Sequence, residues 1–139
     1  MSQPLVYVDR SNVREGALGQ LKPAIAELAA FIEENEPQLI SYSVYLSEDG
    51  SEMIVVHVHP DAASLDHHME LAGHRFAPFA DLLTLSSIDI YGTPSAKALD
   101  QLREKMRLLG SGEVIVHGPH AGFSRPVRAA ALAARQHSA

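Results

Sequence analysis

With 139 residues, of which 46% are hydrophobic and 20% charged, the chain has the size and composition of one folded domain and not of a disordered segment. Its formal net charge of −6, and 11 basic residues that form no stripe on any expected element, argue against nucleic acid as a partner. The absence of cysteine excludes disulfides, thiol nucleophiles and cysteine-ligated metals. No apolar run is long enough to span a membrane, so we expect a cytoplasmic protein.

The first expected strand covers Pro4 to Asp9, and a helix is expected to follow from Ser11 or Asn12. This helix ends at Asn35 to Pro37 and carries apolar residues at spacings of three and four. Pro23 lies inside it and would remove one backbone hydrogen bond. Either the helix kinks at Pro23, or its regular part begins there.

Residues 38–46 and 52–59 predict two antiparallel strands, because the segment between them has the composition of a hairpin turn. Asp61 or Ser64 can cap a second helix that ends near Gly73, and 86–91 predicts another strand. The order strand, helix, strand, strand, helix, strand is the split βαβ arrangement (βαββαβ) of an antiparallel ferredoxin-like α+β fold.

Two further elements are expected after this motif: a helix over 95–109 and a short strand over 113–117. We therefore expect one domain over residues 1–117, with the C-terminal helix and strand appended to the ferredoxin-like core. Residues 118–139 are expected to form a C-terminal tail, weakly helical or ordered on contact.

Alternation along the strands predicts two different faces of the sheet. We expect helices to cover an apolar face formed by Val6, Val8, Ile40, Tyr42, Val44, Ile54, Val56, Val58, Ile88 and Ile90. The opposite face is expected to hold a polar and aromatic set: Tyr7, Ser41, Ser43, Tyr45, His57, His59, Asp89 and Tyr91. Stacking two such sheets in a homodimer would enclose this set. It would then line either a ligand cavity or a wet interface.

The histidines allow several interpretations. His57 and His59 lie two apart on one strand, a spacing that suits a shared metal, a shared ligand or hydrogen-bonded interface residues. His68 lies among apolar helix residues, as either a hydrogen-bonded residue at the edge of the core or a general base for a phenol. Tyr7, Tyr45 and Tyr91 could contact a planar ligand or be ordinary core residues.

Three local motifs resemble the antibiotic biosynthesis monooxygenase-like group of the dimeric α/β-barrel superfamily. These motifs are Asn35-Glu36-Pro37, the segment 61–68 with its acidic start and helical histidine, and Tyr91-Gly92-Thr93-Pro94-Ser95. The resemblance covers residues 4 to about 95 and puts His68, not His67, at the family's histidine position. It implies a homodimer and, for some members, oxidation of phenols, quinols or polyketide-like aromatics by O₂ without metal or flavin. The chain has no Trp, unlike the haem-degrading relatives.

The sequence thus predicts a dimeric α/β barrel that acts on or binds a small aromatic ligand, as a monooxygenase-like enzyme without metal or other cofactor. His68 and His57 are the candidate catalytic residues, and the candidate ligand contacts are Tyr7, Tyr45, His59, Asp89 and Tyr91. The alternative is a non-catalytic binding or interaction module of the same fold. The sequence does not decide between the two.

Overall fold

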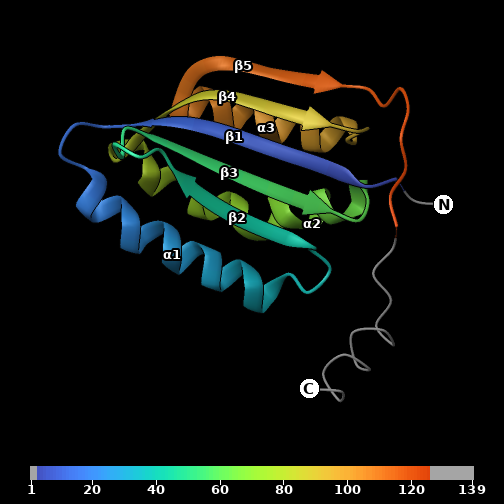
Figure 1. Ribbon diagram of the computed structural model, residues 1–139, viewed down its shortest axis with the longest axis horizontal. Coiled ribbons are helices and arrows are strands. Elements are labelled where there is room, and N and C mark those ends of the chain that lie inside the picture. Colours follow the sequence, from blue (N-terminus) through green and yellow to red (C-terminus); the bar gives the residue numbers. More distant parts are fainter. Residues whose placement is uncertain (1–2, 126–139) are drawn as a thin grey trace.

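The computed structural model describes residues 3–125 and contains a five-stranded sheet in the order β2-β3-β1-β4-β5 (Figure 1). In chain order the strands and α-helices are β1 (Leu5–Val13), α1 (Leu18–Asn35), β2 (Ser41–Leu46), β3 (Glu52–His59), α2 (Ala62–Ala72), β4 (Leu83–Tyr91), α3 (Ala96–Leu109) and β5 (Gly110–His117). Two short 3₁₀ turns, Gly73–Arg75 and Ala77–Asp81, connect α2 to β4. None of the helices among residues 3–125 is long and apolar enough to cross a membrane.

The first four strands confirm the ferredoxin-like arrangement. β1 lies in the middle and pairs antiparallel with β3 and β4, and β2 pairs antiparallel with β3. The appended helix and strand are also present, and α3 returns the chain so that β5 pairs parallel with β4. The sheet is therefore mixed, with β2 and β5 as its two edges (Figure 1).

The start of the first helix differs from the expectation. Ser11 and Asn12 do not cap it, because β1 continues through them and pairs on both sides, Ser11 with Met53 of β3 and with Leu85 of β4. α1 begins at Leu18 and contains Pro23 in its second turn. Pairing with two neighbouring strands satisfies more backbone groups than one side-chain cap could, so the strand extends.

The second and third helices begin at side-chain caps. Of the two residues expected to cap α2, Asp61 and Ser64, the cap is Asp61. Its side chain accepts a hydrogen bond from the backbone N–H of Ser64. Ser95 caps α3 by accepting from the N–H of Ala98, and its hydroxyl also donates to Asp66 of α2. These contacts fix where α3 lies relative to α2.

The assignment of residues to the two faces of the sheet was wrong for β1 and β3. Tyr7 pairs with His57 and Ile90, and His57 pairs with Tyr42, so these four side chains form one row across the sheet. Tyr7, His57 and Ile90 of this row are fully buried. The polar and aromatic residues of β1 and β3 thus lie under the helices, together with the apolar residues of β2 and β4. The valines Val6, Val8, Val56 and Val58, with Ile54, lie on the opposite face and are partly exposed.

Candidate functional site

The sheet and helices enclose a polar cluster in which four of the predicted site residues meet. Tyr7, His57, His59 and His68 are each at most 1% exposed, and their rings lie close together. β1 and β3 position the first three, and α2 contributes His68. A set of polar side chains in the interior of a small domain requires specific partners, because an unpaired buried polar group costs free energy.

His68 is held by a carboxylate. Its Nδ1 lies 3.0 and 2.8 Å from the two carboxylate oxygens of Glu36, the residue that ends α1, and both side chains are fully buried. When Nδ1 carries the proton and donates to Glu36, the Nε2 of a neutral ring keeps a free lone pair. That Nε2 is buried and has no hydrogen-bond partner among the described residues. The arrangement is that of a base oriented by a carboxylate.

His57 lies between Tyr7 and His68. Its ring stacks on Tyr7 with centroids 4.0 Å apart and meets His68 edge-on at 5.1 Å. Burial lowers the pKa of His57 to about 4, although the carboxylate of Asp9, 3.6 Å away, acts in the opposite direction. His57 is therefore neutral near pH 7, and neither of its ring nitrogens has a hydrogen-bond partner within residues 3–125.

His59 completes the histidine cluster and is anchored from α2. Its Nδ1 lies 2.7 Å from the hydroxyl of Ser64, and its ring lies 5.6 Å from that of His68. Burial, followed by the neighbouring His57 and His68, lowers the pKa of His59 to about 3. The Nε2 of His59 is another buried nitrogen without a partner in the described part of the chain.

A buried lysine lies on the other side of Tyr7. Lys105 of α3 donates to the hydroxyl of Tyr7 at 2.6 Å and lies 3.3 Å from Asp9. Burial alone would raise the pKa of Asp9, but Lys105 and His57 outweigh it and hold that pKa well below its usual range. Burial, followed by the charge of Asp9, raises the pKa of Tyr7, which stays a neutral phenol. The cluster thus contains a direct ion pair whose lysine also donates a hydrogen bond to a tyrosine.

The sequence analysis missed Asp9, Glu36, Tyr42 and Lys105 as members of this site. Lys105 was detectable, because it lies at helical spacing within the apolar stripe of Leu102, Met106 and Leu109, where a solvated lysine is not expected. Asp9 follows Leu5 and Tyr7 at the period of a strand. Glu36 gives no local signal of its role, since its partner is 32 residues away in the chain.

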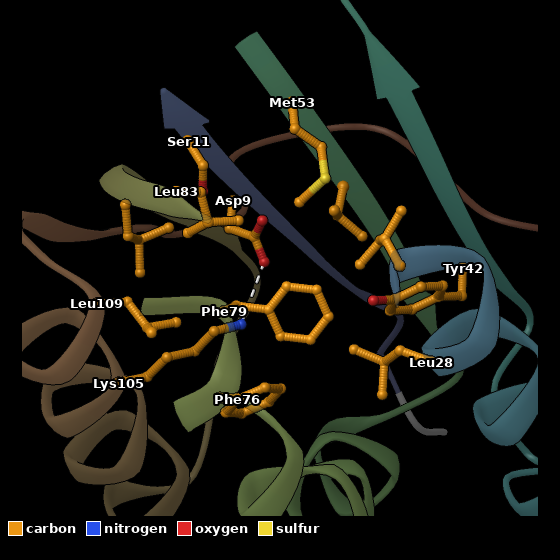
Figure 2. A pocket seen from close by; sticks show the side chains of 13 residues that line it. Asp9, Ser11, Leu28, Tyr42, Met53, Phe76, Phe79, Leu83, Lys105 and Leu109 are labelled. Carbon is orange, nitrogen blue, oxygen red and sulfur yellow. Dashed lines mark hydrogen bonds and ion pairs between the residues drawn. The ribbon is translucent and has the colours of Figure 1, made fainter. Parts of the chain in front are cut away.

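A small cavity of about 30 Å³ adjoins the cluster (Figure 2). The ion pair of Asp9 and Lys105 forms one wall, and the hydroxyl end of Tyr42 points toward the same space. Phe76 and Phe79, from the segment between α2 and β4, close it with apolar surface. A cavity of this size holds about one water molecule.

The structure does not favour the metal interpretation of His57 and His59. Within residues 3–125, no group of three or more His, Asp or Glu side chains is arranged to hold a metal ion. Each of the two histidines instead contacts a different protein group: the ring of Tyr7 for His57 and the hydroxyl of Ser64 for His59.

The remaining predicted ligand contacts lie away from the buried cluster. Asp89 and Tyr91 lie near β5 on the open face of the sheet, the face opposite the helices. There Nε2 of His117 is hydrogen-bonded to Oδ1 of Asp89 at 2.9 Å, and the His117 ring stacks on Tyr91 with ring centroids 4.6 Å apart. Tyr45 is 56% exposed on the edge strand β2. The structure therefore separates these three residues from the histidines with which the sequence analysis grouped them.

Comparisons with known proteins identify the fold. No family model matches the chain, and no curated protein matches it by sequence. Among solved structures, MupZ from Pseudomonas fluorescens matches with a TM-score of 0.68 and 18% identity over 90% of this chain and 97% of its own. SnoaB from Streptomyces nogalater, described as a cofactor-independent oxygenase, matches with a TM-score of 0.53 and 20% identity over 68% of this chain and 97% of its own.

A third structure, assigned to the antibiotic biosynthesis monooxygenases and from Bacteroides thetaiotaomicron, matches with a TM-score of 0.53 and 13% identity. The match covers 60% of this chain and 85% of the other protein. The match to MupZ extends beyond β4 and so includes at least part of the appended elements. The chain therefore has the ferredoxin-like α+β fold of the antibiotic biosynthesis monooxygenase-like proteins, which confirms, at the level of the fold, the resemblance found in its sequence.

Proposed function

We propose that this protein is a cofactor-independent, monooxygenase-like enzyme that removes a proton from a small phenol or quinol at His68 and transfers electrons from the resulting anion to O₂. The observation that carries the proposal is the buried pair of His68 and Glu36, which leaves His68 Nε2 without a partner among the described residues. Imidazole suits this task because its ordinary pKa is near neutral pH.

The reaction balances without a bound redox group. The phenolic proton passes to His68 Nε2, and the phenolate then gives one electron to O₂. The phenoxyl radical and superoxide combine to form a ring carbon–oxygen bond, and the resulting peroxide anion takes the proton back from His68. Loss of water, which includes the hydrogen of that ring carbon, leaves a quinone. One oxygen atom of O₂ ends in the quinone and the other in water.

The surroundings of His68 fit a proton transfer followed by oxidation. Burial of the cluster excludes bulk water, which strengthens electrostatic interactions within it and protects a reactive anion. Lys105 supplies a positive charge near the site, and the hydroxyl of Tyr7 accepts a hydrogen bond from it. The site we propose lies within one chain, between sheet and helices, and not in a cavity between two sheets.

O₂ uptake by metal-stripped protein with a panel of hydroquinones and polyphenols tests this proposal. We expect His68→Gln to lower the rate by at least about 100-fold, within the range that general bases contribute. His67→Gln is the matched control, because His67 is the exposed neighbour on the same helix. Equal rates in both variants and in the blank would contradict the proposal.

A non-catalytic binding module is the second candidate, because none of the residues that line the inner cavity is a histidine and a ligand held there would not touch the proposed base. A cavity of about 30 Å³ is too small for a phenol, so a ligand must displace side chains to enter. A binder would raise the melting temperature in the presence of a ligand without O₂ uptake.

We also propose that two copies form a homodimer through the open face of the sheet. Val6, Val8, Val56 and Val58 form an aliphatic patch there that no helix within residues 3–125 covers. Stacking with the same face of a second copy would remove this apolar surface from water.

A further inference from the structure

A second hollow lies on the outer side of the histidine cluster. It is a groove of about 410 Å³ between the end of α1 and β2. About half of its lining is apolar, from residues that include Ala30, Leu39 and Ile40. The rest is polar and includes the acidic side chain of Glu33. Ile40 is 55% exposed, which leaves a large aliphatic side chain in contact with water.

Two residues connect the groove to the buried site. Glu36, which holds His68, also lines the groove. Tyr42 lines both the groove and the inner cavity, and its ring centroid lies 4.7 Å from that of His57 and 6.2 Å from that of His68. Figure 2 shows the hydroxyl end of Tyr42 directed into the inner cavity. The ring of Tyr42 is thus a wall that the two hollows share.

The volumes explain why both hollows are needed. The inner cavity holds about one water molecule, whereas a substituted phenol needs several times that space. The groove is more than ten times larger and begins at the same tyrosine. β2 is an edge strand, so its outer side is not hydrogen-bonded to a further strand in the described part of the chain.

We propose that the groove binds the apolar chain of an alkyl-substituted phenol, while the hydroxyl group of the same molecule reaches His68 once the Tyr42 side chain turns aside. This inference rests on the proposed function and names its substrate class. Glu33, exposed at the groove, selects against a carboxylate on the chain, so the substituent is neutral.

The test is the affinity of the full-length protein for 4-alkylphenols from methyl to octyl, measured by calorimetry without O₂. Each buried methylene should lower Kd about fourfold, the factor that corresponds to its burial free energy. Ala30→Leu fills the groove and should raise Kd for the longer chains at least about tenfold. Ala26→Leu, on the exposed side of the same helix and outside the groove, should leave the series unchanged.

Three results would overturn the inference: no binding of any alkylphenol, a Kd independent of chain length, or equal series for Ala30→Leu and Ala26→Leu. Failure of the proposed function looks different. If His68→Gln and the unaltered protein bind the series equally but neither consumes O₂, the groove is a ligand site of a binding module. If O₂ uptake depends on His68 while the length of the alkyl chain has no effect on Kd, the proposed enzyme activity is supported and the proposal for the groove is wrong.

Discussion

His57 and His59 are neutral imidazoles inside a protein core, and this has a measurable effect on stability. Burial lowers their pKa values to about 4 and about 3, whereas an unfolded chain has histidine pKa values near 6.5. Below pH 6.5 the unfolded state therefore binds more protons than the folded state. The free energy of unfolding should fall by about 1.4 kcal/mol per pH unit for each histidine, from about pH 6.5 down to about pH 4.

Urea unfolding at several pH values measures this dependence. Replacing His57 and His59 together with Gln removes both titrating groups, so the slope between pH 6 and pH 4 should become shallower. The matched control replaces His67 and His74, which are both exposed, and should keep the original slope. A stability that is flat over this range in the unaltered protein would contradict the neutral, buried state of the two imidazoles.

Lys105 is the residue on which the charge balance of the cluster depends. Lys105→Met leaves the Asp9 carboxylate buried without its main counter-charge, which should cost about 3–5 kcal/mol of unfolding free energy at pH 7. Because burial then raises the pKa of Asp9, the loss should shrink as the pH falls toward 4. Adding Asp9→Asn should restore part of the loss in a double-mutant cycle. Additive losses would show that the two side chains do not interact.

At the scale of elements, the packing of β5 depends on two glycines at its start. A Cβ on Gly112 would lie 1.9 Å from the backbone oxygen of Ser86, and one on Gly110 would lie 1.9 Å from that of Leu85. Side chains at these positions would force the backbones of β4 and β5 apart. The parallel edge strand can therefore form only with glycine there.

Gly112→Ala should lower the free energy of unfolding by about 1–3 kcal/mol, the usual cost of forcing atoms into a packed site. Gly73→Ala is the control, because no atom lies within 4 Å of its added Cβ and its φ of −56° suits any residue. Its effect should be close to zero or slightly stabilising. Denaturant unfolding measures both, and equal effects would mean that β5 does not pack as described.

The elements themselves were largely predictable, because each has a local signal. The hairpin turn between β2 and β3, the cap at Asp61 and the apolar stripe of α3 all lie within a few residues of the structure they specify. The end of β1 was not predictable in this way. Ser11 looks like a helix cap locally, but it pairs with Met53 and Leu85, which lie 42 and 74 residues further along the chain.

At the scale of the whole molecule, the open sheet face predicts the oligomeric state. Val56→Lys places a charge at the centre of the aliphatic patch, opposite Val8, and should convert a dimer into a monomer in light scattering. Because the face is open, the lysine can reach water in the monomer, and circular dichroism should remain unchanged. Ala26→Lys on the exposed side of α1 is the control and should keep the dimer. A monomeric unaltered protein would contradict the proposed homodimer.

The sequence by itself determined the order of the elements, the split βαβ topology, the appended helix and strand, and His68 as a residue of interest. These follow from periodicities and caps that act between neighbours in the chain. Tertiary structure alone decided that the polar residues of β1 and β3 face the helices. Alternation divides a strand into two sets, but it does not say which set lies under a helix when both sets contain large side chains. Tertiary structure also brought Glu36 to His68 and Lys105 to Tyr7, pairs that lie 32 and 98 residues apart in the chain, because long-range contacts depend on strand register and helix packing.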